Sequence, residues 1–313
     1  MNEEIISFVF LISFLESGIR LAIPILLAAI GELFAERSGI LNLGVEGIML
    51  MGSFIGFNVA LSTGDLWLGI MAGILTGVIM GMFMAFMSVT LRVNQVICGL
   101  AVWMVGLGLS SFLFRVTGGH TATARVEGFK ALYIPFLSEV PILGPVLFRH
   151  TILVYISLIL VPISALILFR TTFGLKIRAV GENPRAADAL GINVALIRYL
   201  CIIFGGIMAG LGGSVLVLTY IKMFTEGMTG GRGWIAIAIV IFGKWNPYKV
   251  LVGALLFGLV DAFQLNLQAL GTPIPPQFLQ MLPYILTILV LVGALGKAGV
   301  PLALSKPYSR EEK

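Results

Sequence analysis

Charged residues are scarce in this chain, and their scarcity excludes an ordinary water-soluble protein. Lys, Arg, Asp and Glu make up 11% of the 313 residues, whereas soluble domains average about 25%. Hydrophobic residues reach 58%, and the mean hydropathy is +1.05. The composition predicts an integral membrane protein. The net charge of +5 is expected to reside in membrane-flanking loops and not to bind nucleic acid.

Residues that bind metals or act as nucleophiles are also few. The sequence has two cysteines and two histidines. Cys98 and Cys201 lie in apolar segments, where a lone cysteine packs as a small hydrophobe, and His120 and His150 belong to one polar loop. No carboxylate-rich metal motif is present, and no nucleophile has a base beside it in an apolar segment. We therefore predict neither a metal site nor catalytic residues.

The sequence has no phosphate-binding loop of the kind that hydrolyses ATP. The nearest candidate is the pair Gly296 and Lys297. It has Leu291 where that loop requires glycine, and Ala298 where it requires Ser or Thr. The chain is therefore not expected to hydrolyse ATP by itself, and we expect it to bind no cofactor.

Long apolar runs predict an all-helical membrane protein with about nine spans, within a range of eight to ten. The runs cover residues 18–35, 40–61, 66–90, 96–116, 151–169, 196–220, 234–242, 250–267 and 278–295. The apolar stretch 5–15 is too short to cross a bilayer, so we expect it to lie on the membrane face. Residues 1–313 are expected to form a single transmembrane domain.

The basic residues indicate the orientation of these spans. A cytoplasmic C-terminus would place thirteen Lys and Arg residues inside and seven outside, as the preference for positive charge in the cytoplasm requires. The loop 117–149 is then extracytoplasmic. The loop 171–195 and the tail 296–313 are cytoplasmic.

The first four spans and the last four show a weak internal similarity. Each group contains a glycine-punctuated start, SGILNLGVEG at residues 38–47 and TGGRGW at residues 229–234. An offset of five spans would invert the second group relative to the first. The pattern is compatible with an inverted repeat, which is common in transporters.

The charged loop 171–193 contains a short helix signal. Asn183 can cap a helix, Pro184 suits the first helical position, and Gly191 is a stop signal. These residues predict about two turns of helix on the cytoplasmic side. A helix this short is marginal by itself, so we expect it to pack against another protein.

Glycines recur at every fourth position of the third span. Gly69, Gly73, Gly77 and Gly81 would form one smooth stripe, which allows close approach of a neighbouring helix in a membrane. We interpret this stripe as helix packing and not as a binding site.

Polar residues also occur inside the predicted spans. Asn42 and Glu46 follow Glu32, Glu36 and Arg37 in the first two spans. An intramembrane charge must face protein, a partner or water. Two interpretations remain open: Asn42 and Glu46 line a translocation path, or the charges form structural contacts such as a Glu36–Arg37 pair.

The eighth span carries a second polar stripe. Asp261, Gln264 and Gln268 share one helical face at i, i+3 and i+7. Such a stripe indicates a wetted path or a subunit interface. We include these three residues among the candidates for the translocation path.

Three stretches resemble a known family. They are GLKIRAVGENPRAADALGI (174–192), SGILNLGVEGIMLMGSF (38–54) and GRGWIAIAIVIFGKWNP (231–247). They are similar to ABC importer permeases of the branched-chain amino acid/ribose class, in the nucleoside or simple-sugar subgroup. The resemblance covers nearly the whole chain. It implies a coupling helix that contacts an ATPase, formed by Gly181, Glu182, Asn183, Pro184, Arg185, Ala186, Ala187, Asp188, Leu190 and Gly191.

The resemblance also implies partners and a location. We expect a second homologous permease, an ATPase with tandem domains that binds ATP and Mg, and an extracytoplasmic substrate-binding lipoprotein. The chain would be a multi-pass protein of the prokaryotic plasma membrane. We expect Arg185 and Asp188 to pair with charges of the ATPase, and Ala186, Ala187 and Leu190 to supply the packed face.

An ion-coupled secondary transporter is the alternative. It would use the intramembrane carboxylates Glu32, Glu46 and Asp261 as proton or ion sites. Transport without any ATPase would favour this alternative.

Overall fold

The computed structural model describes residues 2–117, 124–133, 135–271, 274–294 and 299–309, and its regular elements within these ranges are all helical. In chain order the elements are α1 (Asn2–Arg37), α2 (Val45–Thr63), α3 (Leu66–Ala85), η1 (Phe86–Thr90), α4 (Gln95–Val116), η2 (Leu137–Glu139), α5 (Leu143–Phe148), α6 (Ile152–Arg170), α7 (Thr172–Glu182), α8 (Pro184–Ala189), α9 (Val194–Val215), η3 (Leu216–Ile221), α10 (Arg232–Phe242), α11 (Pro247–Ala269), α12 (Pro276–Gln280) and α13 (Leu282–Ala294). The π-helices η1 and η3 continue α3 and α9. His120 and residues 296–298 lie outside the described ranges.

Seven helical stretches among the described residues are long and apolar enough to cross a bilayer. They are α1, α2, α3 with η1, α4, α6, α9 with η3, and α11. The predicted spans 234–242 and 278–295 correspond to shorter apolar stretches, Arg232–Phe242 and Pro276–Val290. The all-helical membrane class is confirmed, whereas the count of nine spans is not. The 11 residues of α10 extend over only about 17 Å, and a bilayer core is about 30 Å thick.

The N-terminal helix differs from the prediction. We expected residues 5–15 to lie apart on the membrane face, but α1 continues without interruption from Asn2 to Arg37. Glu16 and Arg20 do not break the helix because they stand one turn apart and face each other, with 3.7 Å between Arg20 Nη1 and Glu16 Oε1.

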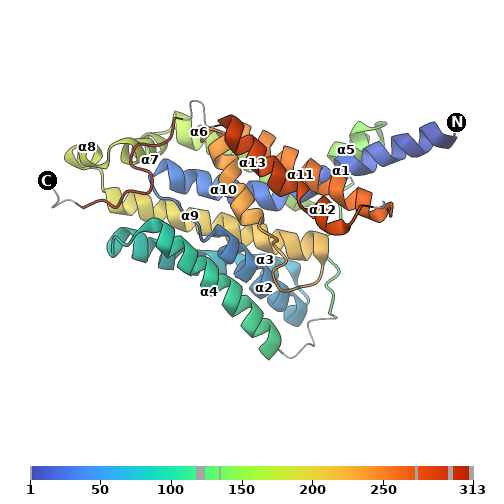
Figure 1. Cartoon of the computed structure of the whole chain (residues 1–313), viewed down its shortest axis with the longest axis horizontal. Coiled ribbons are helices and arrows are strands. Elements are labelled where there is room, and N and C mark those ends of the chain that lie inside the picture. The colour runs from blue at the N-terminus through green and yellow to red at the C-terminus, as the bar shows by residue number, and fades with distance from the viewer. Residues whose placement is uncertain (1, 118–123, 134, 272–273, 295–298, 310–313) are drawn as a thin grey trace.

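Helices α1 and α9 pack against each other at the centre of the bundle (Figure 1). Helices α2 and α3 pack on α9, whereas α10 and α11 pack on α1. Apolar side chains of both central helices, including Leu26 and Ile202, are fully buried. The core of the molecule therefore lies between α1 and α9 and the helices that pack on them.

The four predicted packing glycines of α3 are all buried. A Cβ atom on Gly77 would lie 2.1 Å from the carbonyl oxygen of Gly206 in α9. A Cβ atom on Gly69 would lie 2.6 Å from the carbonyl oxygen of Gly56 in α2. No larger residue fits at these contacts, so backbone lies directly on backbone where α3 meets α2 and α9.

Two irregular segments interrupt the path of the chain. The first break, residues 38–44, joins α1 to α2, and the second break, residues 222–231, joins η3 to α10. Gly39 in the first break and Gly231 in the second have φ values of +89° and +79°, a conformation that favours glycine. The helix that follows each break packs on the central helix of the other half.

Candidate functional sites

Short helix α8 begins and ends as the sequence predicts. The side chain of Asn183 accepts a hydrogen bond from the backbone N–H of Ala186 (3.0 Å), and Pro184 occupies the first turn. Gly191 follows with a φ of +81°. The predicted capping is therefore confirmed, because it depends only on residues close in sequence.

Helix α7 was not predicted, although the sequence contains a signal for it. The Thr171 hydroxyl accepts a hydrogen bond from the Gly174 N–H (3.1 Å) and caps the helix. Ile177 and Val180 are fully buried and lie one turn apart on one face. A threonine cap before apolar residues at helical spacing would have identified α7. The loop 171–195, expected to be the coupling loop, thus contains two helices, and α7 packs beside α8.

The end of α7 is pressed against the end of α1. A Cβ atom on Gly181 would lie 2.1 Å from the Arg37 carbonyl oxygen. The Gly181 carbonyl also accepts a hydrogen bond from the Ala303 N–H of the C-terminal tail (2.9 Å). The tail contacts α8 as well, since the Tyr308 hydroxyl donates to Asp188 Oδ2 (3.1 Å). The described part of the tail therefore holds α7 and α8 against the bundle.

The surface of α8 divides into an inner and an outer side. Ala187 is buried within this chain, whereas Arg185 and Ala186 are exposed and Leu190 is 82% exposed. The expected packed face of Ala186, Ala187 and Leu190 is thus split, with Ala187 directed inward. Arg185 and Asp188 were both expected to pair with charges of a partner, and they also differ. Arg185 is exposed, whereas Asp188 accepts a hydrogen bond from Tyr308 within this chain.

Buried polar side chains hold the first break. Glu32 Oε1 accepts a hydrogen bond from the Asn42 N–H (2.9 Å), and Asn42 Oδ1 accepts one from the Gly44 N–H (3.0 Å). Gln95 Oε1 accepts a further bond from the Leu41 N–H (2.8 Å). Sequence reasoning did not identify this role of Gln95. Asn42 is fully buried, and its side-chain oxygen binds a backbone N–H group of the break.

The expected ion pair between Glu36 and Arg37 is not among the contacts of the described residues. Both side chains bind Trp245 instead. Glu36 Oε2 accepts a hydrogen bond from Trp245 Nε1 (2.6 Å), and Arg37 Nη2 donates to the Trp245 carbonyl (2.9 Å). Neighbouring residues on a helix point in different directions, so they reach one bulky partner from two sides. The end of α1 is thereby tied to the turn between α10 and α11.

Glu46 is the anchor of the second break. Its Oε1 accepts hydrogen bonds from the Thr229 hydroxyl (2.6 Å) and the Gly231 N–H (2.8 Å). Its Oε2 accepts one from the Gly233 N–H (2.6 Å) at the start of α10. A carboxylate at a helix N-terminus is well stabilised because the free N–H groups point toward it. This geometry favours the structural interpretation of Glu46 over direct contact with a solute.

A polar cavity of about 270 Å³ lies beside the N-terminus of α10. Asp261 of α11 forms an ion pair with Arg232 (3.0 Å from Oδ2 to Nη2), and Gln264 Nε2 donates to Asp261 Oδ1 (3.3 Å). Tyr284 of α13 lines the same cavity, and its hydroxyl donates to the Gly230 carbonyl (2.7 Å). Asp261 and Gln264 are thus brought together, whereas Gln268 does not line this cavity.

Arg232 and Gln264 have unused hydrogen-bonding atoms at this cavity. Among the described residues, neither Arg232 Nε nor Gln264 Oε1 has a partner. One is a donor and the other an acceptor, so together they can bind a neutral solute with hydroxyl or amide groups. Gln268 Nε2 also has no partner in the described part of the chain. Sequence reasoning missed Arg232, because its partner Asp261 is distant in sequence.

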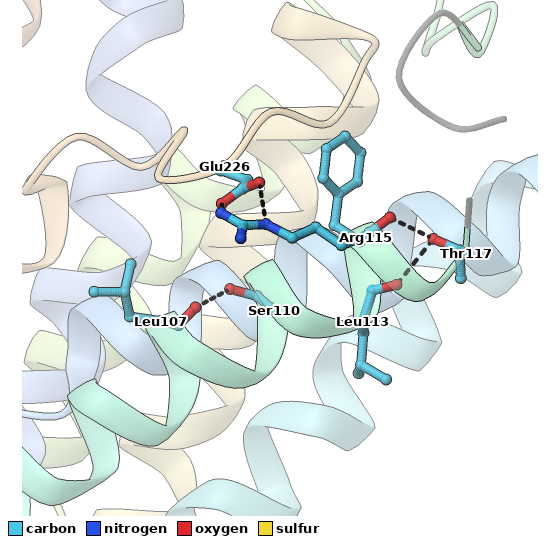
Figure 2. A network of polar contacts seen from close by, with 7 residues as sticks. Leu107, Ser110, Leu113, Arg115, Thr117 and Glu226 are labelled. Carbon is cyan, nitrogen blue, oxygen red and sulfur yellow. Dashed lines mark hydrogen bonds and ion pairs between the residues drawn. The ribbon is translucent and has the colours of Figure 1, made fainter. Parts of the chain in front are cut away.

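The second break also contacts α4 at the surface. Figure 2 shows Arg115 with its guanidinium directed at Glu226, and both contacts measure 3.1 Å. The hydrogen bonds from Arg115 hold the pKa of the Glu226 carboxyl below its usual value. This pair is exposed, so it fixes the position of the loop more than it stabilises the fold.

Metal-binding and redox residues do not gather in the described part of the chain. No group of three or more His, Cys, Asp or Glu side chains there could hold a metal ion. Cys98 and Cys201 are buried and unpaired with each other. The polar features of the described chain are instead a hydrogen-bonding cavity beside the N-terminus of α10 and the exposed short helix α8.

Seven helical stretches in the described part of the chain are long and apolar enough to cross a bilayer, which defines an integral membrane protein. The chain belongs to the family described as "Branched-chain amino acid transport system / permease component", which matches residues 14–291. It is therefore a permease, and it is a multi-pass protein of the plasma membrane.

Relatives described as ABC transporter permeases match most of the chain. The chain is 39% identical to the putative glucose ABC transporter permease protein TsgC13 of Haloferax volcanii, over 95% of this chain and 97% of that one. It is 37% identical to the guanosine ABC transporter permease protein NupQ of Bacillus subtilis, over 93% and 95%. A second guanosine ABC transporter permease of Bacillus subtilis, NupP, is 24% identical over 80% of this chain and 73% of its own length.

Proposed function

We propose that the chain is one of two different permease subunits of an ATP-driven importer for a nucleoside or a simple sugar. The names of its relatives support this substrate class, since they describe permeases for glucose and for guanosine. Two permeases of one organism, NupQ and NupP, both resemble the chain, but at 37% and 24% identity. This chain would be the NupQ-like subunit, and its partner would be a NupP-like permease.

The exposed outer side of α8 is the observation that carries the ATP-driven function. Leu190 at the end of α8 is 82% exposed, and Arg185 and Ala186 are exposed beside it. The opposite side of α8 packs against its own chain through the buried Ala187. A large apolar side chain on a rigid support suits a groove in a partner protein. The partner would be an ATPase that binds ATP and Mg, and Arg185 would pair with one of its acidic residues.

Movement of α8 would reach the far end of the bundle through α10. Gly181 presses on the Arg37 carbonyl, and Arg37 is bonded to Trp245 after the end of α10. The other end of α10 is held by Glu46 and carries Arg232. A shift at α8 would therefore displace α10 along its axis and change the Arg232–Asp261 cavity. This would switch the side on which the path is open.

The translocation path would run beside the Arg232–Asp261 cavity. Gln264 and Gln268 offer further hydrogen-bonding groups on α11. Next to them, α13 exposes an apolar face that includes Ile288 (62%) and Leu289 (64%). The second permease would cover this face, so the path would lie between the two subunits. A binding lipoprotein would deliver the solute at the same end.

Asn42 and Glu46 would shape the path without touching the solute. Their oxygens accept hydrogen bonds from backbone N–H groups, and Glu46 also accepts one from Thr229. Asp261 is paired with Arg232. The relatives named above are all ABC transporter permeases, which disfavours the ion-coupled alternative.

An inverted repeat and nine spans fit the same proposal. In one half α1 leads through the first break to α2, and in the other α9 leads through the second break to α10. The packing of α3 on α9 and of α11 on α1 is what an exchange of the two halves requires. In this arrangement the short helices α10 and α13 would count as spans seven and nine.

Recovery of an ATPase with the purified chain tests the proposal. We expect the wild-type chain to co-purify with an ATPase and to stimulate its activity. Arg185→Glu combined with Leu190→Asp should abolish both without reducing the amount of chain in the membrane. Arg125→Glu, at the opposite end of the bundle, is the matched charge reversal and should change neither. Normal uptake by the double variant, or uptake by the chain alone in liposomes, would reject the proposal.

A further inference from the structure

A second cavity, of about 610 Å³, lies at the end of the bundle opposite α8. Four parts of the chain enclose it: α1 at residues 16–21, the start of α6, the end of η3, and the last turns of α11, with the loop residues Phe129 and Ala131 beside them. It is separate from the Asp261 cavity and shares no residue with it. None of the residues assigned above to coupling or to the path lines it.

The cavity has an excess of positive charge. Arg20, Arg149 and Lys222 line it, and Glu16 is the carboxylate among its lining residues. Glu16 is 3.7 Å from Arg20. Arg149 donates to the neutral carbonyl of Ser138 (2.9 Å). Among the described residues, neither Arg149 nor Lys222 is within 4 Å of a carboxylate. Two cations thus remain unneutralised, and they suit an anionic group.

Lining residues also carry buried polar atoms that the protein does not use. Within the described ranges, His150 Nδ1, Thr151 Oγ1, Thr219 Oγ1 and Tyr220 Oη have no hydrogen-bond partner. His150, Thr151 and Thr219 are at least nine-tenths buried. Leaving such atoms unpaired in a folded protein costs free energy, so they are expected to have a ligand or solvent partner. Three of the four are hydroxyl groups that can donate to an oxyanion.

His150 supplies an acceptor to this set. Its Nε2 lies 2.8 Å from the Val146 carbonyl, which requires the proton on Nε2 and leaves Nδ1 as an acceptor. Burial lowers the pKa of the His150 imidazole and so favours the neutral ring. The cavity therefore combines cations and hydroxyl donors with an acceptor, His150 Nδ1, that no group of the described chain uses. It would bind an oxyanion that also carries a hydroxyl or ammonium donor.

The position of the cavity agrees with the polar boundary of a membrane. Arg20 and Arg37 belong to the same helix, α1, and a rise of 1.5 Å per residue puts them about 26 Å apart, close to the thickness of a bilayer core of about 30 Å. Arg37 lies at the end of the bundle that carries α7. Arg20 is therefore level with the headgroups of the opposite leaflet. Leu265 lines the cavity and is 47% exposed on α11, which connects the cavity to the apolar surface.

We propose that this cavity binds the phosphodiester headgroup of an outer-leaflet phospholipid whose headgroup ends in a hydroxyl or an ammonium. Arg149 and Lys222 bind the phosphate, Thr151 and Thr219 donate to its oxygens, and His150 accepts from the terminal donor. The acyl chains leave past Leu265. The bound lipid ties α1, α6, η3 and α11 together at the end that receives the solute.

The test is a thermal shift of the full-length chain, purified with its co-purifying partners. The probes are short-chain phosphatidylglycerol, glycerol 3-phosphate and inorganic phosphate. We expect the lipid to raise the unfolding midpoint at concentrations about tenfold below those at which either soluble anion acts, because its acyl chains add apolar burial. Arg149→Gln with Lys222→Gln should weaken the lipid effect about tenfold or more. Arg115→Gln, which removes a cation outside the cavity, should leave it unchanged.

Each other result overturns the proposal. Equal protection by inorganic phosphate would show a site for a free anion. Equal protection of wild type and double variant, or no protection at all, would show that the cavity holds only water. If the double variant does not fold, Thr219→Val provides the measurement, since it removes one donor and keeps the charge and the size. It should weaken the lipid effect about fivefold.

Discussion

The two breaks are held in different ways, although they interrupt the chain at corresponding points. None of the seven residues of the first break is exposed, and its backbone bonds to the buried side chains of Glu32 and Gln95. Five of the ten residues of the second break are exposed. Three side chains from other helices bind it: Glu46, Tyr284 and Arg115. The comparison indicates that the first break is a fixed frame and that the second can move against it.

Loss of Glu46 should have the largest effect, because this residue of the first half holds the second break. Glu46→Ala leaves the Thr229 hydroxyl and two backbone N–H groups without an acceptor. We expect it to lower the free energy of unfolding by about 4 kcal/mol. Denaturant titration of the purified chain measures this loss. Glu46→Gln keeps an acceptor oxygen and should lose less stability. If both variants were as stable as wild type, Glu46 would not be the residue that holds the second break.

Loss of Gln95 should affect stability more than transport. Gln95→Ala removes the acceptor of the buried Leu41 N–H, at an expected cost of about 2 kcal/mol. Uptake per folded chain should remain close to wild type if the first break is only a frame. Ile97→Ala is the control and should change little, because Ile97 lies on the same helix and is 61% exposed. A large change in substrate KM in Gln95→Ala would contradict the assignment.

Loss of the Tyr284 hydroxyl should affect transport more than stability. Tyr284→Phe removes one hydrogen bond to Gly230, worth about 1 kcal/mol. If the second break moves during transport, the uptake rate should change about threefold or more while the unfolding midpoint shifts only slightly. Tyr248→Phe, at an exposed position, is the matched control. An unchanged rate in Tyr284→Phe would place the moving segment elsewhere.

The exposed pair of Arg115 and Glu226 should have the smallest effect, and that effect should depend on pH. The folded-state pKa of Glu226 is lowered, so its contribution is present above the unfolded pKa of about 4.3 and is lost as pH falls through the folded value. Wild type should thus be slightly more stable than Arg115→Gln at neutral pH, and the difference should shrink as the pH falls below about 4. A pH series of unfolding midpoints checks this; a difference that grows on acidification would have the wrong sign.

Local rules predicted those parts of the molecule that depend on neighbouring residues. The cap and stop of α8 at Asn183 and Gly191 follow from positions a few residues apart. Composition predicted the membrane class in the same way. The contacts of Trp245 with Glu36 and Arg37 join positions about two hundred residues apart, and no local pattern contains them.

The predicted count of nine spans is not confirmed, and the reason is physical. Helices α10 and α13 are apolar but short, and they are buried in or attached to a bundle that supports them. A rule based on hydropathy counts apolar runs and cannot distinguish a helix that crosses the bilayer alone from one that packs within it. The importance of Arg232 was equally hidden from the sequence, because it comes from a cavity that only the folded chain forms.

The contact between the tail and the bundle has a consequence for the order in which the protein matures. The Ala303 and Ser305 N–H groups donate to the carbonyls of Gly181 and Gly39, which precede them by more than a hundred residues. The ribosome releases these tail residues only after every described helix has been made. The surface that we propose for an ATPase is therefore completed last, and a half-made chain in the membrane would not yet present it. We expect a chain stopped after residue 298 to insert normally but to recover no ATPase, and recovery at the wild-type level would show that α8 is ready earlier.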